Sequence, residues 1–201
     1  MADAADIGLF PLDLVLLPGE ALPLHLFEPR YRQLYADCVL DDEPFVIARA
    51  DGDESARIGC AARFEELSRR HPDGRLDVVV RGAYPVEVLA PTSGRLYRTA
   101  EVRALVDEED AATDAAREQV TARYREFAGS DPEPAGDVPL SYALAGALPL
   151  DLDSKQALLE ERSEARRVEM LDTAIRGALE RNARIAENAR RASMNGHVPH
   201  P

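Results

Sequence analysis

The chain has 201 residues, of which 45% are hydrophobic and 30% are charged, a composition typical of a globular protein. No apolar run approaches the roughly 18 residues that a membrane-spanning helix requires. The acidic start of the chain, Met1 to Asp6, also lacks the positive segment of a signal peptide. We therefore expect a cytoplasmic protein that does not enter a membrane.

The net charge of −13 is concentrated in the first three quarters of the chain. Residues 1–150 hold 28 acidic and 15 basic side chains, whereas residues 151–201 hold nine of each. An acidic surface repels the phosphate backbone of DNA and RNA. The charge distribution therefore argues against nucleic acid as the partner.

The first elements with a clear pattern are a strand and the helix that follows it. Residues 22–27 are apolar and alternate like a strand, and Pro23, which has no N–H group, places this strand at a sheet edge or a bulge. Pro29 suits the first turn of a helix. That helix has one apolar stripe and is expected to end before Asp41; the stripe consists of Tyr31, Leu34, Tyr35 and Cys38.

The next part of the chain is rich in strand patterns. The segment from His71 to Gly74 is a strong hairpin signal, and Pro85 predicts a bulge or an edge within the strand that follows. The expected strands are residues 45–48, 58–67, 76–88 and 97–106. Their number and spacing favour a small barrel or a strongly bent sheet over alternating strands and helices.

From Asp114 onward the pattern becomes helical. We expect one helix up to Gly129, a Pro/Gly-rich loop over residues 130–136, and a short helix over residues 139–148 that Asp137 can cap. A last helix is expected to begin after Asp151 or Asp153 and to continue as a single element to about Met194. The predicted organisation is a β-rich part over residues 1–110 and a helical part over residues 111–201, with a disordered tail at residues 197–201.

Motifs that carry catalysis or bind cofactors are missing from the sequence. It has no GxxxxGK[ST] phosphate loop, GxGxxG, HExxH, CxxC or GxSxG motif. The histidines are widely scattered, at positions 25, 71, 197 and 200, so we expect no metal site and no cofactor. Cys38 and Cys60 lie among apolar neighbours and are expected to be reduced core residues; pairing one of them with His25 as a thiol hydrolase is the remaining enzymatic alternative.

Three segments, in order, resemble one protein family. The run LFPLDLVLLPGEALPLHLFEPRYR over residues 9–32 resembles the opening of the amino-terminal, substrate-binding domain of Lon proteases. The segments PDGRLDVVVRG (residues 72–82) and LPL with KQALLE (residues 148–160) resemble its hairpin and its helical segment. The similarity covers residues 8–179, although Pro85 and Glu87 depart from the family's pattern in the strand after the hairpin.

The resemblance implies an α+β fold in which a PUA-like β pseudobarrel precedes a helical bundle. It also implies a non-catalytic module of protein quality control that binds unfolded proteins or peptides. Since the chain ends before an ATPase or peptidase module could begin, we expect a stand-alone version of the domain. An adaptor or regulator of a full-length protease and an RNA-binding PUA-like protein are the alternative functions.

The candidate peptide-binding patch lies at the start of the first helix and comprises Glu28, Arg30, Tyr31, Arg32 and Tyr35. Arg30 and Arg32 fall in the first helical turn and are expected to point outward. Tyr31 and Tyr35 are one turn apart and can offer flat, rigid contact area. The alternative is structural, with Glu28 forming the corner between strand and helix and Tyr31 belonging to the core.

Overall fold

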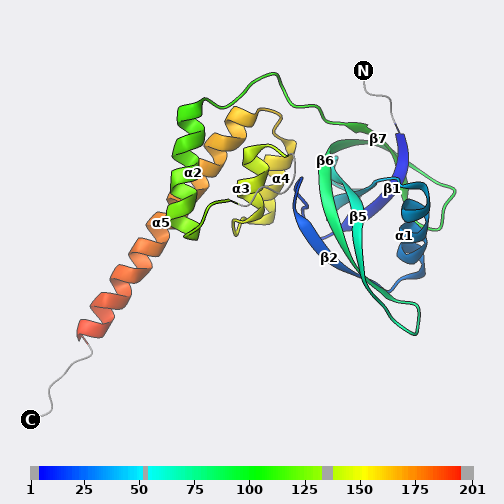
Figure 1. Ribbon diagram of the computed structural model, residues 1–201, viewed down its shortest axis with the longest axis horizontal. Coiled ribbons are helices and arrows are strands. Elements are labelled where there is room, and N and C mark those ends of the chain that lie inside the picture. Colours follow the sequence, from blue (N-terminus) through cyan, green and yellow to red (C-terminus); the bar gives the residue numbers. More distant parts are fainter. Residues whose placement is uncertain (1–4, 52–53, 133–137, 196–201) are drawn as a thin grey trace, which may run out of the picture.

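The computed structural model describes residues 5–51, 54–132 and 138–195. Within them the chain forms a β-rich part and, beside it, a helical part from which one long helix projects (Figure 1). The strands are β1 (Ala5–Leu12), β2 (Ala21–Leu26), β3 (Phe45–Asp51), β4 (Glu54–Ser55), β5 (Ile58–Arg70), β6 (Leu76–Thr92) and β7 (Thr99–Ala104). The helices are α1 (Pro29–Asp41), α2 (Asp114–Ala128), α3 (Leu140–Gly146), α4 (Leu152–Glu160) and α5 (Glu164–Asn195).

The sheet closes on itself. Its strand order is β1-β7-β6-β5-β3-β4, and β1 also pairs in parallel with β3, which closes the ring of strands and leaves the short β4 outside it. All other pairings are antiparallel. The closed sheet followed by helices confirms the predicted α+β fold.

The strand β6 pairs with three other strands on one side of the barrel. It pairs with β5 along one edge, and β2 and β7 follow each other along its opposite edge. The hairpin turn predicted at residues 71–74 connects β5 to β6, with Gly74 at φ +86°, a conformation that favours glycine. The irregularity predicted at Pro85 lies two residues earlier, because the register shift between the pairs Ala61–Tyr84 and Ala62–Gly82 skips Ala83, whereas Pro85 itself pairs with Cys60.

The helix α1 begins at Pro29, as its sequence predicts, and ends at Asp41, slightly later than predicted. The next residue, Asp42, has φ 51° and its backbone N–H donates to the carbonyl of Cys38, which closes the last turn. Three residues of the predicted stripe are buried against the barrel, namely Tyr31, Leu34 and Cys38.

The prediction of a single last helix is wrong, because the chain forms α4 and α5 with a break at Glu161. Asp151, not Asp153, caps α4, since its carboxylate accepts a hydrogen bond from the Ser154 N–H at 2.7 Å. Ser163 accepts a hydrogen bond from the Arg166 N–H at 3.1 Å, as an N-cap does, and so starts α5. The predicted cap Asp137 and the predicted tail lie outside the described residues.

One apolar cluster extends through both parts of the protein. It includes Phe10 and Phe45 of the barrel, Leu34 of α1, Leu144 of α3 and Leu171 of α5. A smaller cluster fills the opposite face of the sheet around Leu9, Val46, Ala61 and Val102. Cys38 and Cys60 are free thiols buried in the large cluster, as predicted.

A buried arginine holds the helical part and the connection from the barrel together. The Arg167 side chain on α5 is completely buried, and its guanidinium forms ion pairs with Asp107 and with Glu164. It also donates to the Ser141 hydroxyl at 3.0 Å and to the Glu161 carbonyl at 2.7 Å. Burial opposes its charge, but the bonds to the carboxylates outweigh this cost and raise the pKa of Arg167.

We predict that Arg167→Met lowers the free energy of unfolding by about 3 kcal/mol, because removing one partner of a buried ion pair leaves the others uncompensated. The matched control is Arg166→Met at the neighbouring position, whose side chain is 71% exposed and lies 3.9 Å from Glu161. The control is expected to change stability by less than about 0.5 kcal/mol. Urea unfolding measures both, and equal effects would contradict the role given to Arg167.

The continuous core also predicts how the protein unfolds. We propose that the β-rich part (residues 1–110) and the helical part (residues 111–201) are subdomains that share one apolar cluster. They are therefore expected to unfold in a single transition, with coincident midpoints for far-ultraviolet circular dichroism at 222 nm, which reports the helices, and for tyrosine fluorescence. Two separate midpoints would show that the parts are independent domains.

Candidate functional site

The strand β2 has one open edge. All six of its residues pair with β6, and no other strand among the described residues pairs with it. The Gly82 N–H donates to the Glu20 carbonyl at 3.0 Å just before this ladder begins. Since paired residues alternate in antiparallel strands, the backbone groups of Leu22, Leu24 and Leu26 face β6, and those of Ala21, Pro23 and His25 face away.

The outward-facing residues Ala21, Pro23 and His25 are all exposed. Pro23 has no N–H group, so at an open edge it leaves no ladder hydrogen bond unmade. This is the physical reason why the sequence predicts β2 to be an edge strand. The open edge therefore offers the Ala21 and His25 N–H groups and three carbonyl groups to an added strand. The sequence pattern predicts the edge strand but does not mark its edge as a binding feature.

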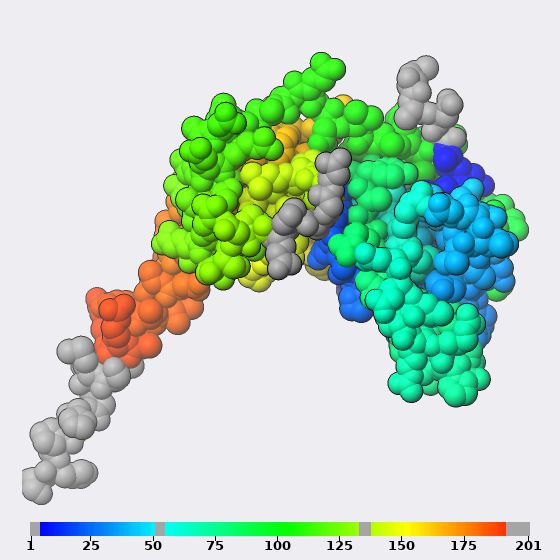
Figure 2. Space-filling view, in the orientation of Figure 1, coloured from blue at the N-terminus to red at the C-terminus, as the bar shows by residue number. Residues whose placement is uncertain are grey.

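The start of the open edge borders a hollow between the barrel and the helices. The hollow has a volume of about 400 Å³, and Gly19, Glu20 and Ala21 line it on the barrel side. Tyr124 and Tyr142 line it on the helical side, together with Ala143, Gly146 and Ala147. In the space-filling view the helical part lies beside the barrel, and α5 projects away from both (Figure 2). Glu20 also forms an ion pair with Lys155 of α4 at 2.6 Å, which helps to hold the two sides at this spacing.

The other end of the edge leads into the predicted patch. Phe27, the residue after β2, is 62% exposed and is one of the large apolar side chains on the surface. Its ring lies 6.2 Å from the His25 ring at an interplanar angle of 22°. The end of β2 therefore presents exposed aromatic surface directly before Glu28.

Within the patch, Tyr31 lies in the core. Its ring stacks on the Phe10 ring at 3.8 Å, only 8% of the residue is exposed, and burial raises the pKa of its hydroxyl. Arg30 covers it, with its guanidinium 4.7 Å from the ring centre and an ion pair to Glu28 at 2.8 Å. The structure thus places Tyr31 beneath the patch and Arg30 on its surface.

The two remaining patch residues are partly exposed and lean toward the β5–β6 hairpin. The Arg32 guanidinium lies 3.5 Å from the Asp73 carbonyl in the hairpin turn. The Tyr35 ring meets the Phe64 ring of β5 edge-on at 4.9 Å. Arg30, Arg32 and Tyr35 therefore give the patch its accessible atoms, and each is already held in place by a neighbour.

The burial of both cysteines argues against the alternative function of a thiol hydrolase. Burial raises the pKa of Cys38 and of Cys60 to about 12 in each case. A cysteine nucleophile needs a thiolate near neutral pH, which such burial disfavours. The side chain of His25 contacts Asp77 of β6 through its Nδ1 atom, at 2.5 Å.

The structure also brings together histidines that appear scattered in the sequence. The His71 Nε2 atom lies 2.7 Å from the same Asp77 carboxylate, and the two imidazole rings are 5.6 Å apart. One sequence feature could have revealed part of this cluster. The hairpin turn at residues 71–74 places His71 near Asp77. The partner strand β2 could not be assigned from the sequence.

The closed barrel, the open edge strand and the helical part together define a mixed α+β domain of the barrel-and-bundle type. The sequence profile of the ATP-dependent protease La (LON) substrate-binding domain matches residues 6–175, and the chain belongs to this family. The predicted resemblance is confirmed. No curated protein matches the chain at a significant level.

Two solved structures show the same fold. A Lon N-terminal domain protein from Xanthomonas campestris is 27% identical with a TM-score of 0.67, over 83% of this chain and 96% of that one. The N-terminal domain of Mycobacterium avium complex Lon protease is 21% identical with a TM-score of 0.63, over 85% and 98% of the two chains. In the part of the chain that the structure describes, no helix is long and apolar enough to cross a membrane.

Proposed function

We propose that this protein binds extended, apolar segments of unfolded proteins and carries out no chemical step on them. The observation that carries this proposal is the open edge of β2, which is exposed and lies between a hollow and an exposed aromatic side chain. The family to which the chain belongs is described as a substrate-binding domain. A module that accepts many clients needs contacts that do not depend on their sequence.

Addition of a strand to β2 meets this requirement. The backbone groups at the open edge bind any extended segment, because every residue except proline carries both an N–H and a C=O group. Side chains of the added strand then provide selectivity, since alternate residues point to opposite faces. One face of such a segment meets the half-buried Leu22 and Leu24 side chains and the hollow beside Ala21.

The charge of the domain adds a second preference. Residues 1–150 carry the whole net charge of −13, and they contain β2 and the barrel. An acidic surface attracts basic segments and disfavours acidic ones. We therefore propose that preferred clients combine apolar residues with lysine or arginine.

The patch at the start of α1 extends this binding surface. Phe27 follows β2 directly, and Arg30 and Arg32 stand one and three residues after the start of α1. Their aliphatic stems can cover apolar side chains of a client, and the guanidinium groups can bind its carbonyl groups. The role of Tyr31 in this surface is to support Arg30 from below.

We predict that an extended apolar peptide loses affinity when alternate backbone nitrogen atoms are methylated, because N-methylation removes the donors that face β2. Two peptides with the same sequence are compared, with methyl groups on the odd or on the even residues. One set is expected to weaken binding on the order of 100-fold, and the other set by much less. Fluorescence anisotropy measures both; equal loss in the two sets would rule out strand addition.

We also predict that Arg30→Glu together with Arg32→Glu weakens binding of an unfolded client on the order of tenfold. Positive charge is mildly unfavourable at a helix N-terminus, so the substitutions are expected to leave the melting temperature nearly unchanged. The matched control is Arg176→Glu together with Arg184→Glu, two exposed arginines of α5. If client affinity stays the same in the first variant, the patch is not part of the binding surface.

A further inference from the structure

We propose that His25, His71 and Asp77 form a binding site for a divalent transition-metal ion, with Zn²⁺ as the ion that best suits the ligands. Two imidazoles and one carboxylate converge there from β2 and from the β5–β6 hairpin. Their potential ligand atoms all lie within 4.8 Å of one another. The site uses the His25 side chain, whereas the proposed client contact at this position uses the His25 backbone groups.

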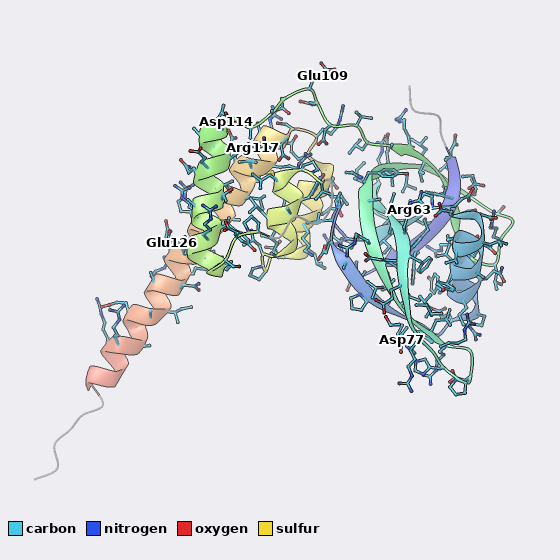
Figure 3. All side chains as sticks on the ribbon, in the orientation of Figure 1. Arg63, Asp77, Glu109, Asp114, Arg117 and Glu126 are labelled. Atoms are coloured by element: carbon cyan, nitrogen blue, oxygen red, sulfur yellow. The ribbon has the colours of Figure 1, made fainter. Side chains whose placement is uncertain are left out.

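The fold determines this convergence through strand register. His25 of β2 lies directly opposite Asp77 of β6 in the antiparallel ladder, so both side chains are on the same face of the sheet. His71 is the residue after β5, and its N–H donates to the Arg75 carbonyl at 2.8 Å, which closes the hairpin turn. Figure 3 labels Asp77 on β6 close to this turn. All three ligands therefore belong to well-defined backbone elements.

The two imidazoles already bracket a single carboxylate. The His25 Nδ1 atom is 2.5 Å from Asp77 Oδ1, and the His71 Nε2 atom is 2.7 Å from Asp77 Oδ2. Tetrahedral Zn²⁺ with bonds of about 2.0–2.1 Å separates its ligand atoms by roughly 3.3 Å. Placing the ion thus requires each nitrogen–oxygen distance to widen by less than about 1 Å, which side-chain torsions can supply.

The charge and exposure of the site also suit a metal ion. The hydrogen bonds from His25 and His71 lower the pKa of Asp77, so the carboxylate is ionised at neutral pH. Arg69 lies opposite Asp77 in the β5–β6 register, but no ion pair joins these two side chains in the described structure. The nearby Arg75 is paired with Asp73 at 2.7 Å. Among the residues that the structure describes, no arginine therefore pairs with the Asp77 carboxylate that the histidines contact.

The ligand set is typical of zinc and its neighbours in the first transition series. Imidazole nitrogen and carboxylate oxygen bind Zn²⁺, Co²⁺ and Ni²⁺, whereas Mg²⁺ and Ca²⁺ prefer oxygen alone. The side chains of His25 and Asp77 are 43% and 37% exposed, which leaves room for water to complete the coordination. A bound ion would tie the end of β2 to the β5–β6 hairpin, next to the exposed Phe27.

The test uses the full-length chain after removal of metal with a chelator. Titration with Co²⁺, followed by its visible absorption, and with Zn²⁺, followed by calorimetry, is expected to show one ion per chain. Asp77→Asn and His25→Ala are each expected to weaken binding by at least about tenfold, which is the lower range found even for residues that only support ligands. Zn²⁺ is also expected to raise the melting temperature of the wild-type protein but not of these variants.

The matched control replaces the other two histidines of the chain, in His197→Ala with His200→Ala. Full affinity in this control, together with loss in Asp77→Asn, supports the site. Loss in the control with retention in Asp77→Asn would place the ion at the C-terminus and overturn the proposal. The absence of binding at millimolar Zn²⁺ would also overturn it, and would leave the triad as a hydrogen-bonded network. Because Asp77→Asn keeps the size of the side chain, circular dichroism is expected to show an unchanged fold.

Discussion

The relative position of the barrel and the helices depends on the hydrogen bonds and ion pairs of the buried Arg167 guanidinium. This group joins Asp107 in the connection after β7 to Ser141 of α3, Glu164 of α5 and the carbonyl at the end of α4. A charge without these partners would be costly inside the apolar cluster. The network therefore specifies one arrangement of three helices and the connection, and this arrangement sets the helical side of the hollow beside β2.

The open edge of β2 follows from a different constraint, the length of β6. That strand has 17 residues and extends past the closed part of the barrel, so β2 and β7 occupy successive parts of one edge. The barrel closes through β7, β1 and β3 and leaves the outer edge of β2 unpaired by any described strand. Proteins usually protect such edges because they invite pairing with other chains. In a protein that binds unfolded segments, the same property is useful.

Hydrogen bonds and charge have different roles in the proposed recognition of unfolded clients. Backbone groups of β2 provide contacts that any extended client can use, and the acidic barrel favours clients with basic residues. Phe27, Arg30 and Arg32 add side-chain contacts at the end of the strand. The triad of His25, His71 and Asp77 lies at the same end, on the face shared by β2 and β6.

The sequence alone determined that a β-rich part precedes a helical part, the helix start at Pro29, the hairpin at residues 71–74 and the family, because each depends on local backbone preferences or on contiguous motifs. The tertiary structure decided the contacts between residues far apart in the chain, which no local sequence pattern contains. Tyr31 belongs to the core because Phe10 lies across it, and the last helical run breaks at Glu161 because Ser163 and the bonds of Arg167 stabilise a second helix start. His25 meets Asp77 because β2 pairs with β6 in one register. Such pairings join residues far apart in the chain, and their free energy comes from the packed core as a whole.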